Sequence, residues 1–263
     1  MNEFVFKKKY GQNFLSDKNL LNAVADDAEI TNSSEVLEIG AGAGSLTSIL
    51  DCKAKKVVSY EIDKDLKESL LALNLKNTTF VFGDFMDASI DEVEKMFNKN
   101  YKVVANLPYY ITTPIILKLF ESKKLESLTI MVQKEVAERI TAKVGGKDYG
   151  SLSVLAQFFG ESKITRIVKR QMFFPQPNVD SAVLHIKIDK KRFAGVAEKD
   201  FLKFVQNCFA MKRKTLLNNL GKMFDKNKLK DAFDEKTLAR RAESLSLEEF
   251  VELYRKTKGL SQK

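Results

Sequence analysis

The chain has 263 residues, 44% hydrophobic and 30% charged, with only 12 Gly and 4 Pro, which excludes collagen-like, low-complexity and wholly disordered proteins. Its formal net charge is +9, and residues 191–263 carry +8 of it, with 18 Lys or Arg against 10 Asp or Glu. This asymmetry favours an acidic partner, with nucleic acid ahead of a membrane surface. No apolar run is long enough to span a bilayer and the N-terminus lacks a secretory pattern, so we expect a cytoplasmic protein with no membrane partner.

Short apolar runs alternate with helical patterns between residues 36 and 133. Each run is about five residues long and rich in Val, Ile and Phe, as buried parallel strands are. Strand and helix repeating at this period predict a doubly wound α/β sheet with right-handed crossovers. The predicted strands are 36–40, 57–61, 79–84, 102–107 and 128–133.

The pattern changes after residue 133. Helices are predicted at 134–143 and from 151, and two alternating runs, 163–170 and 182–189, predict an antiparallel pair added to the sheet. Beyond 191 every segment is helical in pattern: 198–210, 212–223, 226–233, 235–243 and 246–258. We therefore expect two domains, residues 1–190 for catalysis and residues 191–263 as a small, basic, all-α domain.

Three strand ends carry the residues of an adenosine-type ligand site. Gly40, Gly42 and Gly44 follow the first strand, where they allow a sharp turn and a close approach of the backbone to a ligand. Their GxGxG spacing is not the GxGxxG dinucleotide fingerprint. Glu61 ends the second strand, where a carboxylate can accept hydrogen bonds from both ribose hydroxyls. Asp84 ends the third strand and can accept from the exocyclic amine of an adenine.

The segment NLPYY at 106–110 is the most specific signal in the chain. The Asn106 side-chain oxygen and the Leu107 carbonyl can both accept from an aromatic amine, which favours a pyramidal nitrogen with a localised lone pair. Pro108 stiffens the backbone that aims this carbonyl. Tyr109 offers a face on which a flipped base can stack. These four residues are the predicted catalytic group, and they require no metal.

Two further segments complete the expected site. Phe173 or Phe174, in the turn-rich segment 173–180, could close the other side of a base pocket, or could be an ordinary core aromatic. Residues 7–15, KKKYGQNFL, are an ordinary basic tail or a lid that touches phosphate and cofactor. A metal site is not expected, because the chain has one His, two Cys and no CxxC pair.

A basic cluster begins the predicted helix 212–223. It consists of Lys212, Arg213 and Lys214. Clusters of this kind on helices commonly contact phosphate, and the competing interpretation is a solvated helix face.

Together these motifs identify a family. The chain resembles the KsgA/RsmA family of ribosomal RNA small-subunit adenine N6-dimethyltransferases over nearly its whole length. The resemblance implies a class I methyltransferase fold, S-adenosylmethionine as methyl donor, and two adjacent adenosines in the 3′-terminal hairpin loop of 16S rRNA as substrate. The motifs that carry it are YGQNFL at 10–15, EIGAGAGSLT at 38–47, EID at 61–63, GDF at 83–85, NLPY at 106–109, FFPQPNVDSAV at 173–183 and KRKTLLNN at 212–219.

The resemblance also implies residue roles. Six residues would contact the cofactor: Asn13, Leu15, Gly40, Glu61, Asp84 and Asn106. Tyr109, Phe174 and the cluster at 212–214 would contact the RNA. Tyr110 departs from the family pattern, which usually has Asn there.

Other functions stay open at this level. The nearest alternative is a 23S rRNA dimethyltransferase of the antibiotic-resistance type, and a glutamine or DNA-amine methyltransferase is more distant. The chain could also act as a checkpoint in assembly of the small subunit. The glycine turn, taken alone, would also allow a dinucleotide oxidoreductase. We expect a monomer whose work is coupled to ribosome biogenesis.

Overall fold

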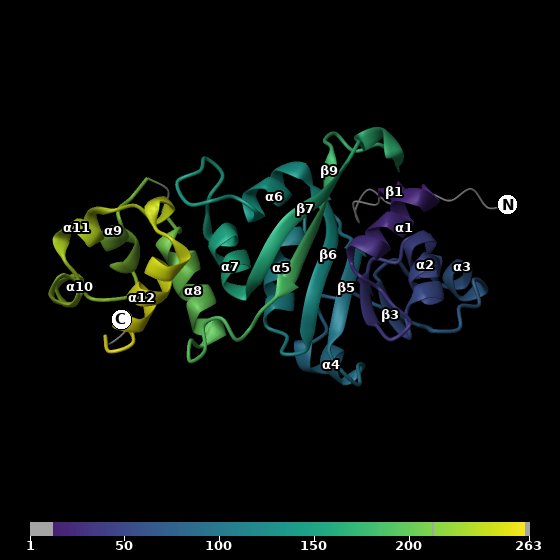
Figure 1. Ribbon diagram of the computed structural model, residues 1–263, viewed down its shortest axis with the longest axis horizontal. Coiled ribbons are helices and arrows are strands. Elements are labelled where there is room, and N and C mark those ends of the chain that lie inside the picture. Colours follow the sequence, from purple (N-terminus) through teal and green to yellow (C-terminus); the bar gives the residue numbers. More distant parts are fainter. Residues whose placement is uncertain (1–12, 212, 261–263) are drawn as a thin grey trace. The chain divides into compact units, whose positions relative to one another are not determined.

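The computed structural model of the chain describes residues 13–211 and 213–260 (Figure 1). The chain forms two compact units. The first unit comprises Met1–Ala137 and Lys163–Ile188, and the second comprises Glu138–Ser162 and Asp189–Lys263. Residues 138–162, which precede the domain boundary predicted near 190, are therefore in the same compact unit as the C-terminal helices.

A seven-stranded sheet, in the order β4-β3-β2-β5-β6-β9-β7, organises the first unit. The neighbours from β4 to β6 run parallel, and β9 runs antiparallel to β6. This confirms the predicted α/β sheet with an antiparallel addition. Its strands are β2 (Glu35–Ile39), β3 (Lys56–Glu61), β4 (Thr78–Phe82), β5 (Tyr101–Asn106), β6 (Leu125–Gln133), β7 (Gly160–Val168) and β9 (Ser181–Ile188).

Helices follow most of the parallel strands, and α2 packs on β3 while α5 packs on β6. The sequence interpretation did not include α1, which packs on α2 and is capped by Asp17, whose side chain accepts from the Leu20 amide at 2.9 Å. The helices of this part are α1 (Lys18–Asp27), α2 (Ser45–Lys53), α3 (Lys67–Ala72), α4 (Ile90–Lys95), α5 (Thr112–Phe120) and α6 (Lys134–Ile140), with the 3-10 turns η2 (Lys64–Leu66) and η3 (Arg170–Met172).

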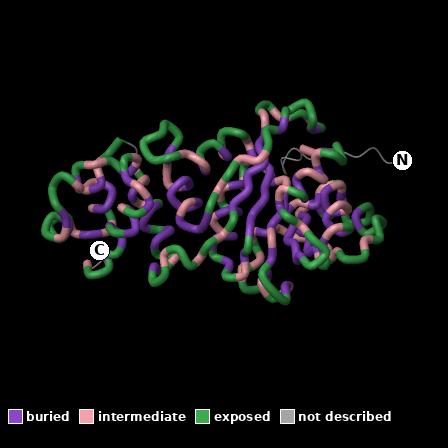
Figure 2. The backbone as a smooth tube through the Cα atoms, viewed as in Figure 1, coloured by how far each residue is buried: buried purple, intermediate pink, exposed green. Residues whose placement is uncertain are grey.

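The core of the first unit lies on the central strands, which Figure 2 shows as continuously buried. Leu37 of β2, Val103 of β5 and Ile130 of β6 have no exposed surface. Burial on both faces explains why these strands appear as mostly apolar runs, rather than as alternating apolar and polar residues, in the sequence. The carboxyl ends of β2, β3 and β5 meet at one edge of the sheet. Because β9 is antiparallel, its first residue, Ser181, reaches that same edge.

A second, very small sheet pairs β1 (Phe14–Leu15) with β8 (Phe173–Phe174). The strands are antiparallel, with Phe14 opposite Phe174 and Leu15 opposite Phe173. This sheet joins the N-terminal segment to the loop between β7 and β9. The sequence did not predict either strand.

The second unit is helical in its C-terminal part. Its helices are α7 (Ser151–Phe159), α8 (Glu198–Cys208), α9 (Leu216–Leu220), α10 (Lys226–Ala232), α11 (Glu235–Ala239) and α12 (Leu247–Thr257), with the 3-10 turn η4 (Ala242–Ser244). Aromatic rings form its core: Phe201 lies 4.3 Å from Phe158 and 5.5 Å from Tyr254 between ring centroids. In the part of the chain that the structure describes, no helix is long and apolar enough to cross a membrane.

The predicted helix 212–223 is wrong at its start. Arg213 has φ +66°, and Thr215 is the extended N-cap of α9, which begins only at Leu216. The Asn219 side chain accepts from the Met211 amide at 2.8 Å, which closes the preceding segment into a loop. Arg213 and Lys214 therefore lie in a loop before the helix and are exposed there, while Lys212 lies outside the described residues.

Candidate active site

The glycine turn after β2 forms the floor of the site. Gly40 and Gly42 have φ angles of +85° and +56°, which residues with a Cβ rarely adopt. A Cβ at position 42 would also lie 2.9 Å from Cε1 of Phe14, so the ring of Phe14 packs against this glycine. The turn then leads directly into α2, whose first backbone N–H groups have no carbonyl partner within the helix.

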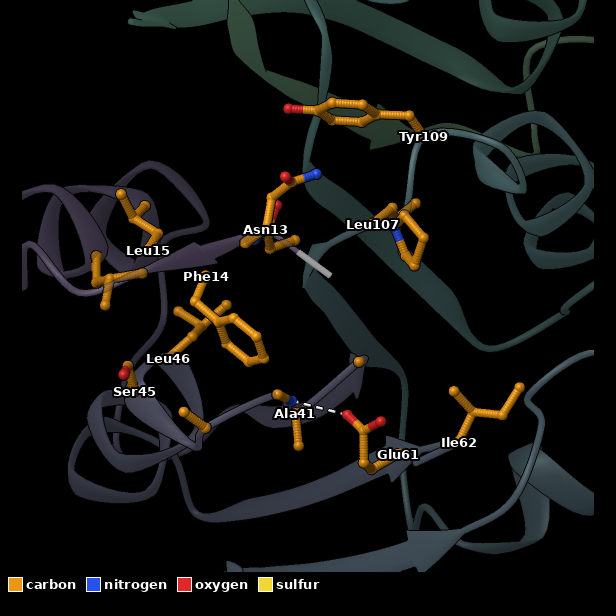
Figure 3. Close-up of a pocket in the computed structure, with 16 residues that line it drawn as sticks. Asn13, Phe14, Leu15, Ala41, Ser45, Leu46, Glu61, Ile62, Leu107 and Tyr109 are labelled. Atoms are coloured by element: carbon orange, nitrogen blue, oxygen red, sulfur yellow. Dashed lines mark hydrogen bonds between the residues drawn. The ribbon is translucent and has the colours of Figure 1, made fainter. Parts of the chain in front are cut away.

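Glu61, at the end of β3, is tied to this turn. One carboxylate oxygen accepts from the Gly42 amide at 2.7 Å and the other accepts from the Asp63 amide at 2.8 Å. The side chain is almost fully buried, and this burial raises its pKa above the ordinary value of 4.5. Figure 3 shows the carboxylate directed into the pocket, with its hydrogen bond to the glycine turn drawn as a dashed line.

A second buried carboxylate, Glu38, lies within β2. Its Oε2 accepts from the Thr47 hydroxyl at 2.6 Å and from the Ser59 hydroxyl at 2.5 Å, whereas Oε1 is buried without a hydrogen-bond partner among the described residues. Burial is the main reason that the pKa of Glu38 rises to about 7. Sequence reasoning passed over this residue, although a carboxylate inside the apolar run VLEIG is an unusual feature that could have drawn attention to it.

Asn106 ends β5 beside the glycine turn. Its side-chain nitrogen donates to the Asn13 carbonyl at 3.0 Å, which fixes the orientation of the amide and leaves the Oδ1 oxygen as its acceptor. The Pro108 carbonyl accepts from the Ile111 amide and the Thr112 hydroxyl within the next turn.

Tyr109 stands at the opposite end of the pocket from Glu61, with Asn13 and Phe14 between them (Figure 3). Its hydroxyl and the Ser181 hydroxyl are hydrogen-bonded to each other at 2.6 Å. Burial raises the pKa of Tyr109 above its ordinary value of 10.0, so the phenol is protonated near neutral pH.

Glu61, Asn106 and Tyr109 line one pocket, whose empty volume is about 760 Å³ including the open solvent at its mouth. Eight of the predicted site residues line it together with the glycine turn, α2 and β1. The lining residues are Asn13, Phe14, Leu15, Leu21, Gly40, Ala41, Gly42, Ala43, Ser45, Leu46, Glu61, Ile62, Asn106, Leu107, Pro108 and Tyr109.

Asp84 and Phe174 do not line this pocket. Asp84 follows β4, next to the strand that ends in Glu61, and its side chain accepts from the Met86 amide at 2.8 Å. Lys118 of α5 holds the same loop, donating to the Phe85 and Met86 carbonyls at 2.8 and 2.7 Å. Phe174 lies on β8 with 68% of its surface exposed.

The predicted basic cluster belongs to the second unit, whereas every residue of the pocket belongs to the first. Over residues 13–211 and 213–260, no group of three or more His, Cys, Asp or Glu side chains could hold a metal ion.

Comparisons with known proteins agree along nearly the whole chain. The family model "Ribosomal RNA adenine dimethylase" matches residues 3–258. A "Ribosomal RNA small subunit methyltransferase A" of Listeria monocytogenes is 45% identical over 269 aligned residues, covering 95% of this chain and 90% of that protein. The protein of the same name from Fusobacterium nucleatum is 41% identical, and the alignment covers 98% of this chain and 99% of that protein.

Two solved structures share the fold. A dimethyladenosine transferase from Plasmodium falciparum superposes with a TM-score of 0.79 at 27% identity, covering 93% of this chain and 97% of that one. The 23S rRNA methyltransferase ErmE superposes with a TM-score of 0.69, also at 27% identity, over 94% and 100% of the two chains. These likenesses confirm the class I methyltransferase fold expected from the sequence.

Proposed function

Because the chain belongs to the ribosomal RNA adenine dimethylase family, we propose that it dimethylates N6 of two adjacent adenosines in the 3′-terminal hairpin loop of 16S rRNA. The observation that carries the proposal is the pocket in which the glycine turn and Glu61 meet the segment Asn106–Tyr109. Glu61 can accept hydrogen bonds from a ribose, and Asn106 and Leu107 can accept them from an amine. Their presence in one pocket suits the transfer of a small group from an adenosine cofactor to an aromatic amine.

The residues present fit S-adenosylmethionine. A Cβ at Gly42 would fill space beside Phe14, and the buried Glu61 carboxylate faces the pocket. When bound, S-adenosylmethionine supplies an electrophilic methyl group on a sulfonium centre. Asn13 and Leu15 would lie over the cofactor, while Gly40 would meet its amino-acid part, Glu61 its ribose and Asp84 its adenine.

The segment Asn106–Tyr109 would orient the target amine. The Asn106 Oδ1 atom and the Leu107 carbonyl would accept its two N–H groups and leave the nitrogen lone pair directed at the methyl group. The hydrogen bond from the Asn106 side-chain nitrogen to the Asn13 carbonyl supports this role, because it leaves Oδ1 as the acceptor of that amide. After transfer the nitrogen carries an acidic proton, which passes to water, so a strong general base is not needed.

Tyr109 and Phe174 would hold the flipped adenine by stacking. Phe174 is largely exposed and pairs with Phe14, which lines the pocket, and the half-buried ring of Tyr109 belongs to the lining itself. Lys212, Arg213 and Lys214 would contact rRNA phosphates, and residues 191–263 would supply most of the electrostatic affinity through their net charge of +8.

The partner would be 16S rRNA within the small subunit, in the cytoplasm, and the protein would act as a monomer. The identity of 41–45% to small-subunit enzymes, against 27% to a 23S rRNA enzyme, supports the small subunit over the 23S alternative.

The test uses purified subunits that lack their adenosine methyl groups. Incubation with radiolabelled S-adenosylmethionine, followed by mapping of the modified nucleotides, should place label on two adjacent adenosines of 16S rRNA and leave large subunits unlabelled. Labelling of 23S rRNA alone would overturn the proposal in favour of the alternative. The Asn106→Ala variant is the control for contaminating methyltransferases.

A further inference from the structure

Ser181 lies beside the proposed catalytic segment, although nothing in the sequence motifs gives it a role there. It is the first residue of β9 and sits opposite Gln133, the last residue of β6. The strand β6 also pairs with β5, where Met131 lies opposite Asn106. Only one strand therefore separates Ser181 from the end of β5, and Tyr109 extends across this strand to reach it.

The contact between the two hydroxyls is strong and enclosed. Its length of 2.6 Å is at the short end of the range for hydrogen bonds between hydroxyls. Ser181 has no exposed surface, and its backbone is held in the ladder between β6 and β9. A hydroxyl fixed in this way gives the tip of the Tyr109 ring a fixed anchor.

The same residue ends the loop that carries Phe174. The preceding residue, Asp180, closes the base of that loop: its carboxylate accepts from the Arg170 amide at 3.1 Å and from the Lys169 ammonium at 3.0 Å. The Asp180 carbonyl also accepts from the Lys134 amide at 3.0 Å. The loop is thus held at Asp180 and the Tyr109 ring at Ser181, the next residue along the chain.

We propose that Ser181 is a positioning residue, which sets the orientation of the Tyr109 ring relative to the loop that carries Phe174. The inference rests on the proposed function, in which these two aromatic side chains hold the target adenine. Ser181 does not touch the substrate. It restricts rotation of the Tyr109 ring about its side-chain bonds, so that the stacking face is formed before RNA binds.

The kinetic test is a double-mutant cycle on the full-length protein. Ser181→Ala, Tyr109→Phe and the double variant are compared in single-turnover methylation of small subunits, with S-adenosylmethionine affinity measured by calorimetry. One neutral hydrogen bond corresponds to about a 3- to 10-fold change in rate. We expect a loss of that size in each single variant, no further loss in the double variant, and unchanged cofactor affinity.

The matched control is Ser127→Ala. Ser127 is also a buried serine of this sheet, but its hydroxyl has no hydrogen-bond partner in the described structure. Wild-type rates in S127A would show that losing a buried hydroxyl does not by itself slow the reaction. If S181A fails to fold, S181C replaces it, because a thiol keeps the volume and weakens the hydrogen bond.

A second measurement does not depend on methylation. In the free protein, NMR signals of ¹³C-labelled tyrosine rings, with Tyr109 assigned by its loss in Y109F, should shift and become averaged in S181A and stay unchanged in S127A. If the wild type fails to methylate small subunits, the proposed function is wrong, and these signals still decide the positioning role. Unchanged Tyr109 signals in S181A, or rate losses that multiply in the double variant, would overturn the inference.

Discussion

Replacing Glu38 with Gln should change the pH dependence of folding stability. Burial raises the pKa of this carboxyl from 4.5 to about 7 in the folded chain. Between these values the folded state holds a proton that the unfolded state has released, so the free energy of unfolding falls as pH rises through this window. Above about pH 7 both states are ionised, and the cost of the buried charge is fully present.

The size of the effect follows from the shift. At about 1.4 kcal/mol per pKa unit, the wild type should lose roughly 2–3 kcal/mol between pH 5 and pH 8 through Glu38. The Gln side chain does not titrate, and its oxygen can still accept from Thr47 and Ser59. The stability of Glu38→Gln, measured relative to the wild type, should therefore increase by that amount over the same interval.

The assay is urea denaturation followed by circular dichroism at several pH values. Comparing the variant with the wild type cancels contributions from other titrating groups, such as His185, whose pKa is lowered by burial. Val36→Ala, a fully buried change on the same strand, is the control, and its difference from the wild type should be the same at pH 5 and pH 8. A Glu38→Gln difference as flat as that of V36A would refute the reasoning.

Three further predictions concern the proposed function. Asn106→Ala should fold and yet lose about 10²–10³ in single-turnover rate, because a positioned polar group of the site is removed; near-normal rates would contradict its role. Glu61→Ala should weaken S-adenosylmethionine binding about tenfold or more in calorimetry, since a hydrogen bond to a charged group contributes about 1.5–3 kcal/mol, and binding to RNA should change little. Replacing both Arg213 and Lys214 with Ala should flatten the plot of log binding constant against log salt concentration for small subunits, by about 0.7–0.9 in slope for each phosphate that the protein no longer neutralises. Cofactor affinity should stay unchanged and is the internal control, whereas an unchanged slope would show that these cations only solvate the loop.

The central sheet could be predicted because its strands are buried on both faces. A mostly apolar run such as 102–107 identifies β5 within one residue, and the strand ends then indicate which polar side chains share an edge. This is why Gly40, Glu61 and Asn106 could be assigned to one site before their contacts were known. The position of each strand and the polar residue at its end can be recognised from the local sequence, whereas the order of the strands in the sheet cannot.

The features that the sequence missed depend on distant partners. The strands β1 and β8 have two residues each, too few for any periodicity, and each exists because the other is present. The bond between Tyr109 and Ser181 spans 72 positions of the chain. The start of α9 was misplaced for a related reason. The pattern of 212–223 is helical, but the Asn219 side chain binds the Met211 backbone and Thr215 has an extended conformation at the N-cap position.

The contact between Phe14 and Gly42 limits which sequences this fold can accept. A methyl group at position 42 would displace the Phe14 ring, and displacing Phe14 would pull on its backbone pairing with Phe174. A mutation in the glycine turn would thus disturb a loop that lies more than a hundred residues away in the chain. We expect residues 14 and 42 to tolerate substitution poorly one at a time and to change together when related chains diverge.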